Sequence, residues 1–237
     1  MRLVVMALPG GLGSGIQGFV DIFAVARECL ALGGVVPTTD LDVVLCTPEG
    51  RPVLDGMGRQ HGPGVALKDV GACDAVFVPG LMIGREMRLP DLAPLESAVE
   101  FVRSAHAHGA IVASSCSGAL ILAAAGLLDG RHCTASWWMI DALRALTPRA
   151  KLAVGAALVE DGRVITGGGP FSWISVALRA LRLRLGADAA RMIANFTVVD
   201  TAPISQVPFM PAALGAPGEA FAAEAEAVLR RRRGESV

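Results

Sequence analysis

The sequence predicts an α/β fold, with a mostly parallel central sheet and helices on both of its faces. Short apolar stretches without a helical period alternate with helix-forming stretches along most of the chain. This alternation is typical of parallel strands joined by right-handed crossovers. Apolar residues make up 53% of the 237 residues and charged residues only 18%, so the chain can bury a large core. One large α/β unit would account for nearly all of this length.

The elements follow from the local pattern, taken in order. Apolar stretches predict strands at residues 3–8, 41–47, 74–78 and 110–115. Helices are predicted at residues 16–32, 94–108, 119–125, 139–146, 171–185 and 187–197. Residues 51–72 are polar and glycine-rich, which indicates short strands and loops. Residues 151–166 are predicted as a hairpin, because Asp161-Gly162 suits a tight primed turn.

The chain divides into two parts by composition. Residues 1–200 carry the alternating pattern and are expected to form one domain. Residues 201–217 contain four prolines and predict an extended connector, and residues 218–233 predict an amphipathic helix ending in four arginines. We therefore predict a domain over residues 1–200 and a connector with a C-terminal helix over residues 201–237.

The stretch at residues 110–125 is the strongest candidate for a functional site. An apolar strand turns directly into a buried helix at Cys116, Ser117 and Gly118, which is the plan of a nucleophile elbow. We expect this corner to be exposed and to hold the side chain out where a ligand can reach it. A thiol at this corner faces the positive end of a helix dipole, which favours thiolate. The alternative is that Cys116 is one more small core residue, as unpaired cysteines usually are.

Composition excludes several other classes of protein. The net charge of −1 argues against nucleic-acid binding by the bulk of the chain. Five cysteines without ligand spacing indicate reduced thiols, not a disulfide framework or a metal site. The N-terminus lacks a signal-peptide core, and the apolar run around residues 110–125 is too short to span a bilayer. We expect a cytoplasmic protein with no metal and no cofactor.

Three segments of the chain resemble one family: SSCSGALILAAAGLLDGRHCTASWW, EDGRVITGGGPFSWISVALRALR and VVDTAPISQVPF. They resemble the ThiJ/PfpI (class I glutamine amidotransferase-like) superfamily. More narrowly, they resemble the amidotransferase-like domain in the N-terminal half of one group of AraC-type transcriptional regulators. The resemblance covers about residues 1–210 and implies a flavodoxin-like three-layer sandwich.

The resemblance implies a catalytic cysteine that works with a downstream histidine and with an acid on the first helix. Cys116 matches the elbow cysteine, but the histidine position falls on Ser136 and the acid position on or beside Gln17. Neither Ser nor Gln titrates near neutral pH, so neither can exchange a proton with the thiol there. Asp21, one helical turn beyond Gln17, is an alternative acid or a solvated charge. His61 falls in a loop with no partner in view.

The remaining positions predict a binding pocket at the carboxyl ends of the strands. The expected ligand contacts come from Gln17, Gly80, Ser117, Ser136, Trp137 and Gly168. We therefore expect a non-catalytic, ligand-sensing domain of an AraC-type regulator that binds an unidentified small molecule beside Cys116. The alternative is a cysteine-dependent small-molecule hydratase or hydrolase of the isonitrile-hydratase type, and a weaker one is a thiol redox sensor.

The expected partners follow from the same resemblance. Superfamily members commonly pair, and the low charge fraction with three tryptophans favours a homodimer. Residues 221–237 match the start of a helix that opens a helix-turn-helix domain in the regulators. We expect DNA binding only through an additional domain not present in this chain.

Overall fold

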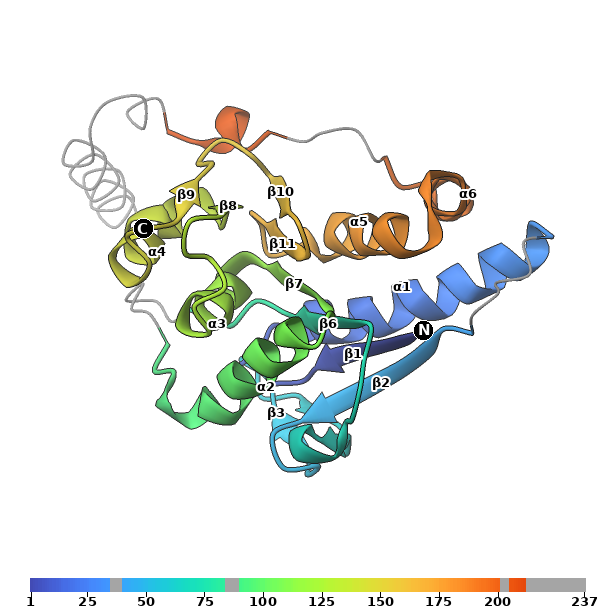
Figure 1. Ribbon diagram of the computed structural model, residues 1–237, viewed down its shortest axis with the longest axis horizontal. Coiled ribbons are helices and arrows are strands. Elements are labelled where there is room, and N and C mark those ends of the chain that lie inside the picture. The colour runs from blue at the N-terminus through green and yellow to red at the C-terminus, as the bar shows by residue number, and fades with distance from the viewer. Residues whose placement is uncertain (35–39, 84–89, 201–204, 212–237) are drawn as a thin grey trace, which may run out of the picture.

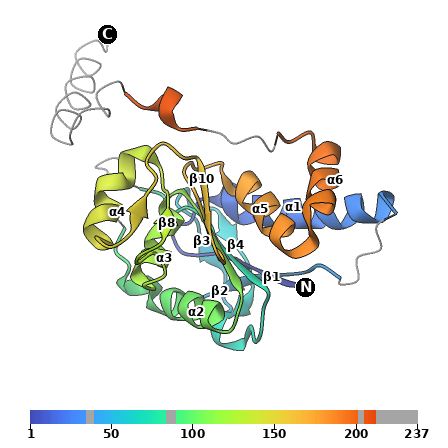
Figure 2. The same cartoon turned by 45° about the horizontal axis from the view of Figure 1, so that its top comes forward.

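The computed structural model describes residues 1–34, 40–83, 90–200 and 205–211. These residues form a seven-stranded sheet with helices on both faces (Figures 1 and 2). The sheet order is β10-β11-β7-β6-β1-β2-β5, and every neighbouring pair in it is parallel except β10 with β11. The predicted α/β class with a mostly parallel sheet is confirmed.

The strands are short and apolar, as expected for strands buried on both faces. The large sheet contains β1 (Arg2–Met6), β2 (Asp42–Thr47), β5 (Val65–Ala66), β6 (Ala75–Val78), β7 (Ile111–Ser115), β10 (Leu158–Asp161) and β11 (Val164–Gly167). Two further pairs lie outside it: β3 (Val53–Leu54) with β4 (Gln60–His61), and β8 (His132–Cys133) with β9 (Lys151–Leu152).

The helices form the outer two layers. One face is covered by α1 (Gly13–Leu32), α5 (Trp173–Leu185) and α6 (Ala187–Thr197), and the other by α2 (Glu96–Ala107), α3 (Ala119–Ala124) and α4 (Ile140–Leu146). Short 3-10 turns lie at Leu67–Asp69, Ala93–Leu95, Cys116–Gly118, Trp137–Met139 and Val207–Phe209. No helix among the described residues is long and apolar enough to cross a membrane.

Successive strand residues point to opposite layers, so the sheet separates two cores. In β1, Val4 packs with the α2–α3 layer and Leu3 with the α1–α5 layer. Phe77 of β6 lies under α1, with its ring centroid 5.1 Å from that of Phe19 and 4.6 Å from that of Phe23. This aromatic cluster holds the N-terminal half of α1 on the sheet.

The predicted hairpin is shorter than expected. Leu158–Asp161 and Val164–Gly167 pair around Gly162, but residues 151–152 pair with β8 instead. Between them, the Gly155 carbonyl accepts from the Gln206 amide at 2.8 Å. A segment distant in sequence therefore satisfies the backbone that would have lengthened the hairpin. The helix predicted at residues 218–233 lies outside the described residues.

Candidate functional site

Three neighbouring strands end at the same edge of the sheet. The register pairs Ser115 of β7 with Gly167 of β11, and Ser114 of β7 with Val78 of β6. Gly80, Cys116 and Gly168 follow these strand ends within two residues. The prediction that these positions gather at the carboxyl ends of adjacent strands is confirmed by the register.

The corner at Cys116 is a strained turn. Cys116 has a φ of +51°, a left-handed conformation that costs a residue with a Cβ on the order of 1–3 kcal/mol. Gly118 allows the tight turn, because a Cβ there would lie 2.6 Å from the Val78 carbonyl oxygen and 2.7 Å from that of Pro79. The strand therefore enters the helix only with this cysteine conformation and a glycine two residues later.

The thiol of Cys116 faces a serine. Its Sγ lies 3.0 Å from Oγ of Ser136, and both residues are buried, with 5% and 2% of their surface exposed. The sequence predicted an exposed corner at Cys116, and this was wrong, because the Ser136 loop and Gly80 cover it. A Cβ on Gly80 would lie only 3.2 Å from that of Cys116.

The side chain of Ser117 is hydrogen-bonded to the loop that follows β6. Its hydroxyl donates to the Leu81 carbonyl oxygen at 2.6 Å and accepts from the Leu81 amide at 2.7 Å. Gly80 in turn accepts from the Leu12 amide at 2.6 Å. Side chain and backbone thus fasten the loops that follow β1, β6 and β7 to one another, so the corner is rigid.

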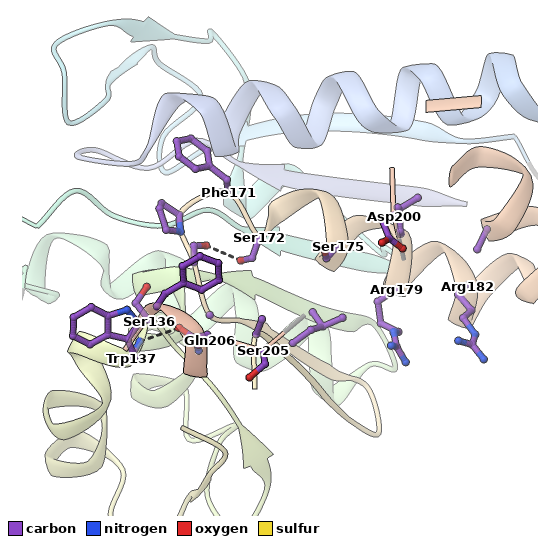
Figure 3. Close-up of a pocket in the computed structure, with 18 of the residues that line it drawn as sticks. Ser136, Trp137, Phe171, Ser172, Ser175, Arg179, Arg182, Asp200, Ser205 and Gln206 are labelled. Carbon is purple, nitrogen blue, oxygen red and sulfur yellow. Dashed lines mark hydrogen bonds between the residues drawn. The ribbon is translucent and has the colours of Figure 1, made fainter. Parts of the chain in front are cut away.

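A cavity of about 810 Å³ opens beside Ser136 (Figure 3). Its wall contains aromatic side chains, three arginines and small polar residues. The lining includes Ser136, Trp137, Trp138, Gly168, Gly169, Pro170, Phe171, Ser172, Ser175, Arg179, Arg182, Arg191, Asp200, Ser205, Gln206 and Phe209. Ser136, Trp137 and Gly168 of the predicted ligand contacts line it, whereas Cys116 lies behind Ser136 and does not.

Gln206 fixes one wall of this cavity and was missed by the sequence prediction. Its buried amide accepts from the Trp137 amide at 3.0 Å and donates to the carbonyl oxygens of Ala135 and Ala156 at 3.0 and 2.8 Å. It also donates to the Thr134 hydroxyl at 3.3 Å. The described part of the connector, residues 205–211, is therefore hydrogen-bonded to the domain.

Gln17 lies in a second, shallower cavity of about 340 Å³, lined by Gly13, Ser14, Gln17, Arg59, Gln60 and His61. His61 places Nδ1 3.4 Å from Oε1 of Gln17 and Nε2 2.9 Å from Oδ2 of Asp55. The sequence left His61 without a partner, and this was wrong: the β3–β4 pair carries it to α1. Asp21 is exposed to solvent on the same helix.

The carboxylate of Asp55 stabilises a second cluster, which consists of Asp55, His61 and Gln17. Burial raises its pKa, but hydrogen bonds from His61, from the backbone amides of Arg59 and Met57 and from the Arg59 guanidinium together lower the pKa well below its usual range. Asp55 is therefore ionised at neutral pH and accepts a hydrogen bond from Nε2–H of His61. Both ring nitrogens of His61 are thus directed at Asp55 and Gln17.

The other four cysteines are poor nucleophiles. Burial raises the pKa of the Cys46 thiol to about 12 and of the Cys73 and Cys133 thiols to about 11. Burial also raises the pKa of Cys29. The thiolate fraction of these groups at neutral pH is very small.

The chain matches a known protein family. The profile of the DJ-1/PfpI family matches residues 24–183, which is more than half of the chain. The chain belongs to the DJ-1/PfpI family. This confirms the resemblance to the ThiJ/PfpI superfamily seen in the sequence.

Curated relatives of this DJ-1/PfpI chain include an enzyme and regulators. The isonitrile hydratase of Pseudomonas putida is 32% identical over 154 residues, which cover 65% of this chain and 64% of the hydratase. The HTH-type transcriptional regulator GlxA of Rhizobium meliloti is 29% identical over 175 residues, covering 73% of this chain and 52% of the regulator. The chain thus spans less than two thirds of either relative.

Solved structures share the fold. An AraC family transcriptional regulator from Pseudomonas putida superposes with a TM-score of 0.67 at 17% identity, covering 83% of this chain and 98% of that one. Drosophila melanogaster DJ-1beta superposes with a TM-score of 0.66 at 20% identity, covering 84% of this chain and 98% of that one. At these identities the likeness establishes the fold alone.

Proposed function

We propose that this chain is a non-catalytic, ligand-sensing domain of an AraC-type transcriptional regulator, and that its ligand is a small molecule bound in the large cavity beside Ser136. The observation that carries the proposal is the pair formed by Cys116 Sγ and Ser136 Oγ, 3.0 Å apart. The group facing the thiol does not titrate near neutral pH, so it cannot act as the general base or acid that thiol catalysis needs.

Among the described residues, the side-chain hydrogen bond of Cys116 is to Ser136 and not to a titratable group. Gln17, at the position of the family acid, does not titrate and is exposed on α1. The neighbouring histidine, His61, directs its ring nitrogens at Gln17 and Asp55.

The cavity has the properties of a binding site. Its volume of about 810 Å³ lies in the range of small-molecule pockets. Trp137, Phe171 and Phe209 supply apolar surface, and Ser136 and Ser175 supply hydroxyl groups. Phe171 and Phe209 are 67% and 72% exposed, which leaves apolar area for a ligand to cover.

Binding is tested by titrating candidate metabolites against the tryptophan fluorescence of the purified chain. Binding should quench this fluorescence, and Trp137→Phe should reduce the response because Trp137 lines the cavity. Cys116→Ser should bind with unchanged affinity, because the thiol lies behind Ser136. A ligand whose binding depends on the Cys116 thiol and not on the cavity wall would contradict the proposal.

The second candidate function is a thiol hydratase of the isonitrile-hydratase type. The identity of 32% to the hydratase of Pseudomonas putida favours it. The two functions are separated by following isonitrile loss with wild type and Cys116→Ser. We expect no difference between the two proteins. A robust rate that disappears in Cys116→Ser would replace the sensor proposal with the enzyme.

The proposal extends to the state of the chain in the cell. We propose a cytoplasmic homodimer that contacts DNA through an additional domain. The exposed apolar side chains Val25, Phe196 and Val198 on and beside α1 and α6 support an apolar contact between copies. Sedimentation velocity at micromolar concentration should give a dimer, and a monomer alone would remove this part of the proposal.

In gel shifts, this chain should bind DNA at most weakly and without sequence preference.

A further inference from the structure

We propose that the ligand of the large cavity is an organic anion: a molecule with a flat apolar body and a single acidic head group such as a carboxylate or sulfonate. This inference rests on the proposed function and names the class of ligand. It follows from the separation of apolar and basic side chains along the cavity. Figure 3 shows Trp137 and Phe171 at one side of the view, with Arg179 and Arg182 at the other.

The basic end is formed by two helices. Arg179 and Arg182 lie one turn apart on α5 and extend in the same direction, and Arg191 joins them from α6. Asp200 is the acidic residue of the cavity lining, and two further carboxylates, those of Glu160 and Asp188, lie beside Arg179 and Arg191 outside the lining. The capacity of this end to bind an anion therefore depends on Arg182.

The three guanidinium groups differ in their partners. Nη1 of Arg179 donates to Glu160 at 3.2 Å, and Nη2 of Arg191 lies 3.6 Å from the exposed Asp188. Among the described residues, the Arg182 guanidinium makes no ion pair or hydrogen bond. Its five donors are therefore free to take an acidic head group, with bidentate geometry available.

Arg182 is not needed to end its helix. The neighbouring Arg184 donates to the carbonyl oxygens of Asp74 and Gly109, 2.6 and 3.3 Å away, and so ties the C-terminal turn of α5 to the sheet. Arg184 does not line the cavity, whereas Arg182 does. The division of roles between the two arginines favours a ligand-binding role for Arg182.

The apolar end matches the body of such a ligand. Trp137, Pro170, Phe171 and Phe209 form this part of the wall. Flat rings gain both buried area and favourable edge or face contacts against aromatic side chains. A molecule long enough to lie along the cavity would place its body against these side chains and its head group at Arg182.

The test uses two fluorescent probes with related aromatic bodies: anilinonaphthalene sulfonate, which is anionic, and phenylnaphthylamine, which is neutral. Wild type should bind both. Arg182→Gln should lower the affinity for the sulfonate probe roughly tenfold, because a charge-assisted hydrogen bond at an exposed group contributes the lower part of its usual range. The same substitution should leave the affinity for the neutral probe unchanged. Arg27→Gln on α1, outside the cavity, is the matched control and should change neither.

A second pair of variants separates this inference from the proposed function. Phe171→Ala should weaken the binding of both probes several-fold, whereas Phe196→Ala, which removes another exposed ring outside the cavity, should weaken the binding of neither. If Phe171→Ala acts but Arg182→Gln does not distinguish the probes, the anion inference is wrong and the binding cavity stands. If neither variant affects either probe, or neither probe binds, the cavity is not the binding site and both proposals fail.

Discussion

Gln206→Ala should weaken the docking of residues 205–211 on the domain. The substitution removes the bond that Oε1 of Gln206 accepts from the Trp137 backbone amide and the two N–H bonds of Nε2, which are shared among three acceptors. Each is worth about 1 kcal/mol net. The single proton of the Thr134 hydroxyl can be donated to the Ala156 carbonyl oxygen at 2.8 Å, so this oxygen keeps a donor and the penalty is smaller. We therefore expect docking of residues 205–211 to weaken by about 2–3 kcal/mol.

Hydrogen exchange measured by mass spectrometry is the assay. Docking protects the backbone amide of Gln206, because this N–H donates to the Gly155 carbonyl oxygen. Exchange of the peptide covering residues 205–211 should accelerate on the order of 30- to 160-fold. Ser205→Ala, which removes an exposed hydroxyl bonded to the same carbonyl, should accelerate it only slightly. Unchanged exchange in Gln206→Ala would refute the assignment of Gln206 as the anchor.

Gln206→Glu should make the docking of residues 205–211 depend on pH. At neutral pH the new carboxylate would face the carbonyl oxygens of Ala135 and Ala156 without a proton to donate, so docking should be weaker than in Gln206→Ala. This environment raises the pKa of the carboxyl when the segment is docked. Docking should therefore recover as the pH falls toward 5 and the carboxyl takes up a proton. A pH-independent Glu variant would contradict the geometry.

The remaining predictions concern the elbow, the second cluster and the packing of α1. Iodoacetamide should label Cys116 before Cys133, whose pKa burial raises to about 11; labelling is read by peptide mapping. The stability that ionised Asp55 provides should be present above about pH 4 and lost as the pH falls below it, so urea midpoints of Asp55→Asn should depend less on pH between 7 and 3. Gly18→Ala should destabilise the protein by about 2 kcal/mol or more in urea unfolding, because its Cβ would lie 2.6 Å from the Trp173 ring.

Matched controls accompany these predictions. Gly169→Ala should be close to neutral, because nothing lies within 4 Å of a Cβ there. For the acid series, Asp21→Asn replaces an exposed carboxylate and should leave the pH profile as in wild type. First labelling at Cys29 or Cys133 would contradict the elbow assignment.

Elements whose signal is local were predictable from the sequence. Strands β6 and β7 appear as uninterrupted apolar runs, and the Asp161-Gly162 turn places β10 against β11. The pattern of helix 187–197 is bounded by Gly186, and the structure has the same bounds. Because parallel strands share one direction, their ends predict where the candidate residues gather.

Contacts between distant segments were not predictable in the same way. Gln206 and Thr134 are 72 positions apart, and His61 and Gln17 are 44 apart, with no local pattern that pairs them. For His61 a usable signal was present: Asp55-Gly56 directly after Val53-Leu54 is a turn signal, and a hairpin there brings His61 opposite Val53. For Gln206 the sequence carries no comparable signal, since its partners are mostly backbone atoms.

The wall formed by Ser205, Gln206 and Phe209 makes ligand binding and segment docking linked equilibria. A ligand that touches this wall loses those contacts whenever the segment leaves the domain. The factor by which docking raises the ligand's affinity is then also the factor by which the ligand raises docking. A tenfold preference for the docked form would hold the segment by about 1.4 kcal/mol more. Through this reciprocity, the protection of a single backbone amide, that of Gln206, measures the occupancy of the cavity.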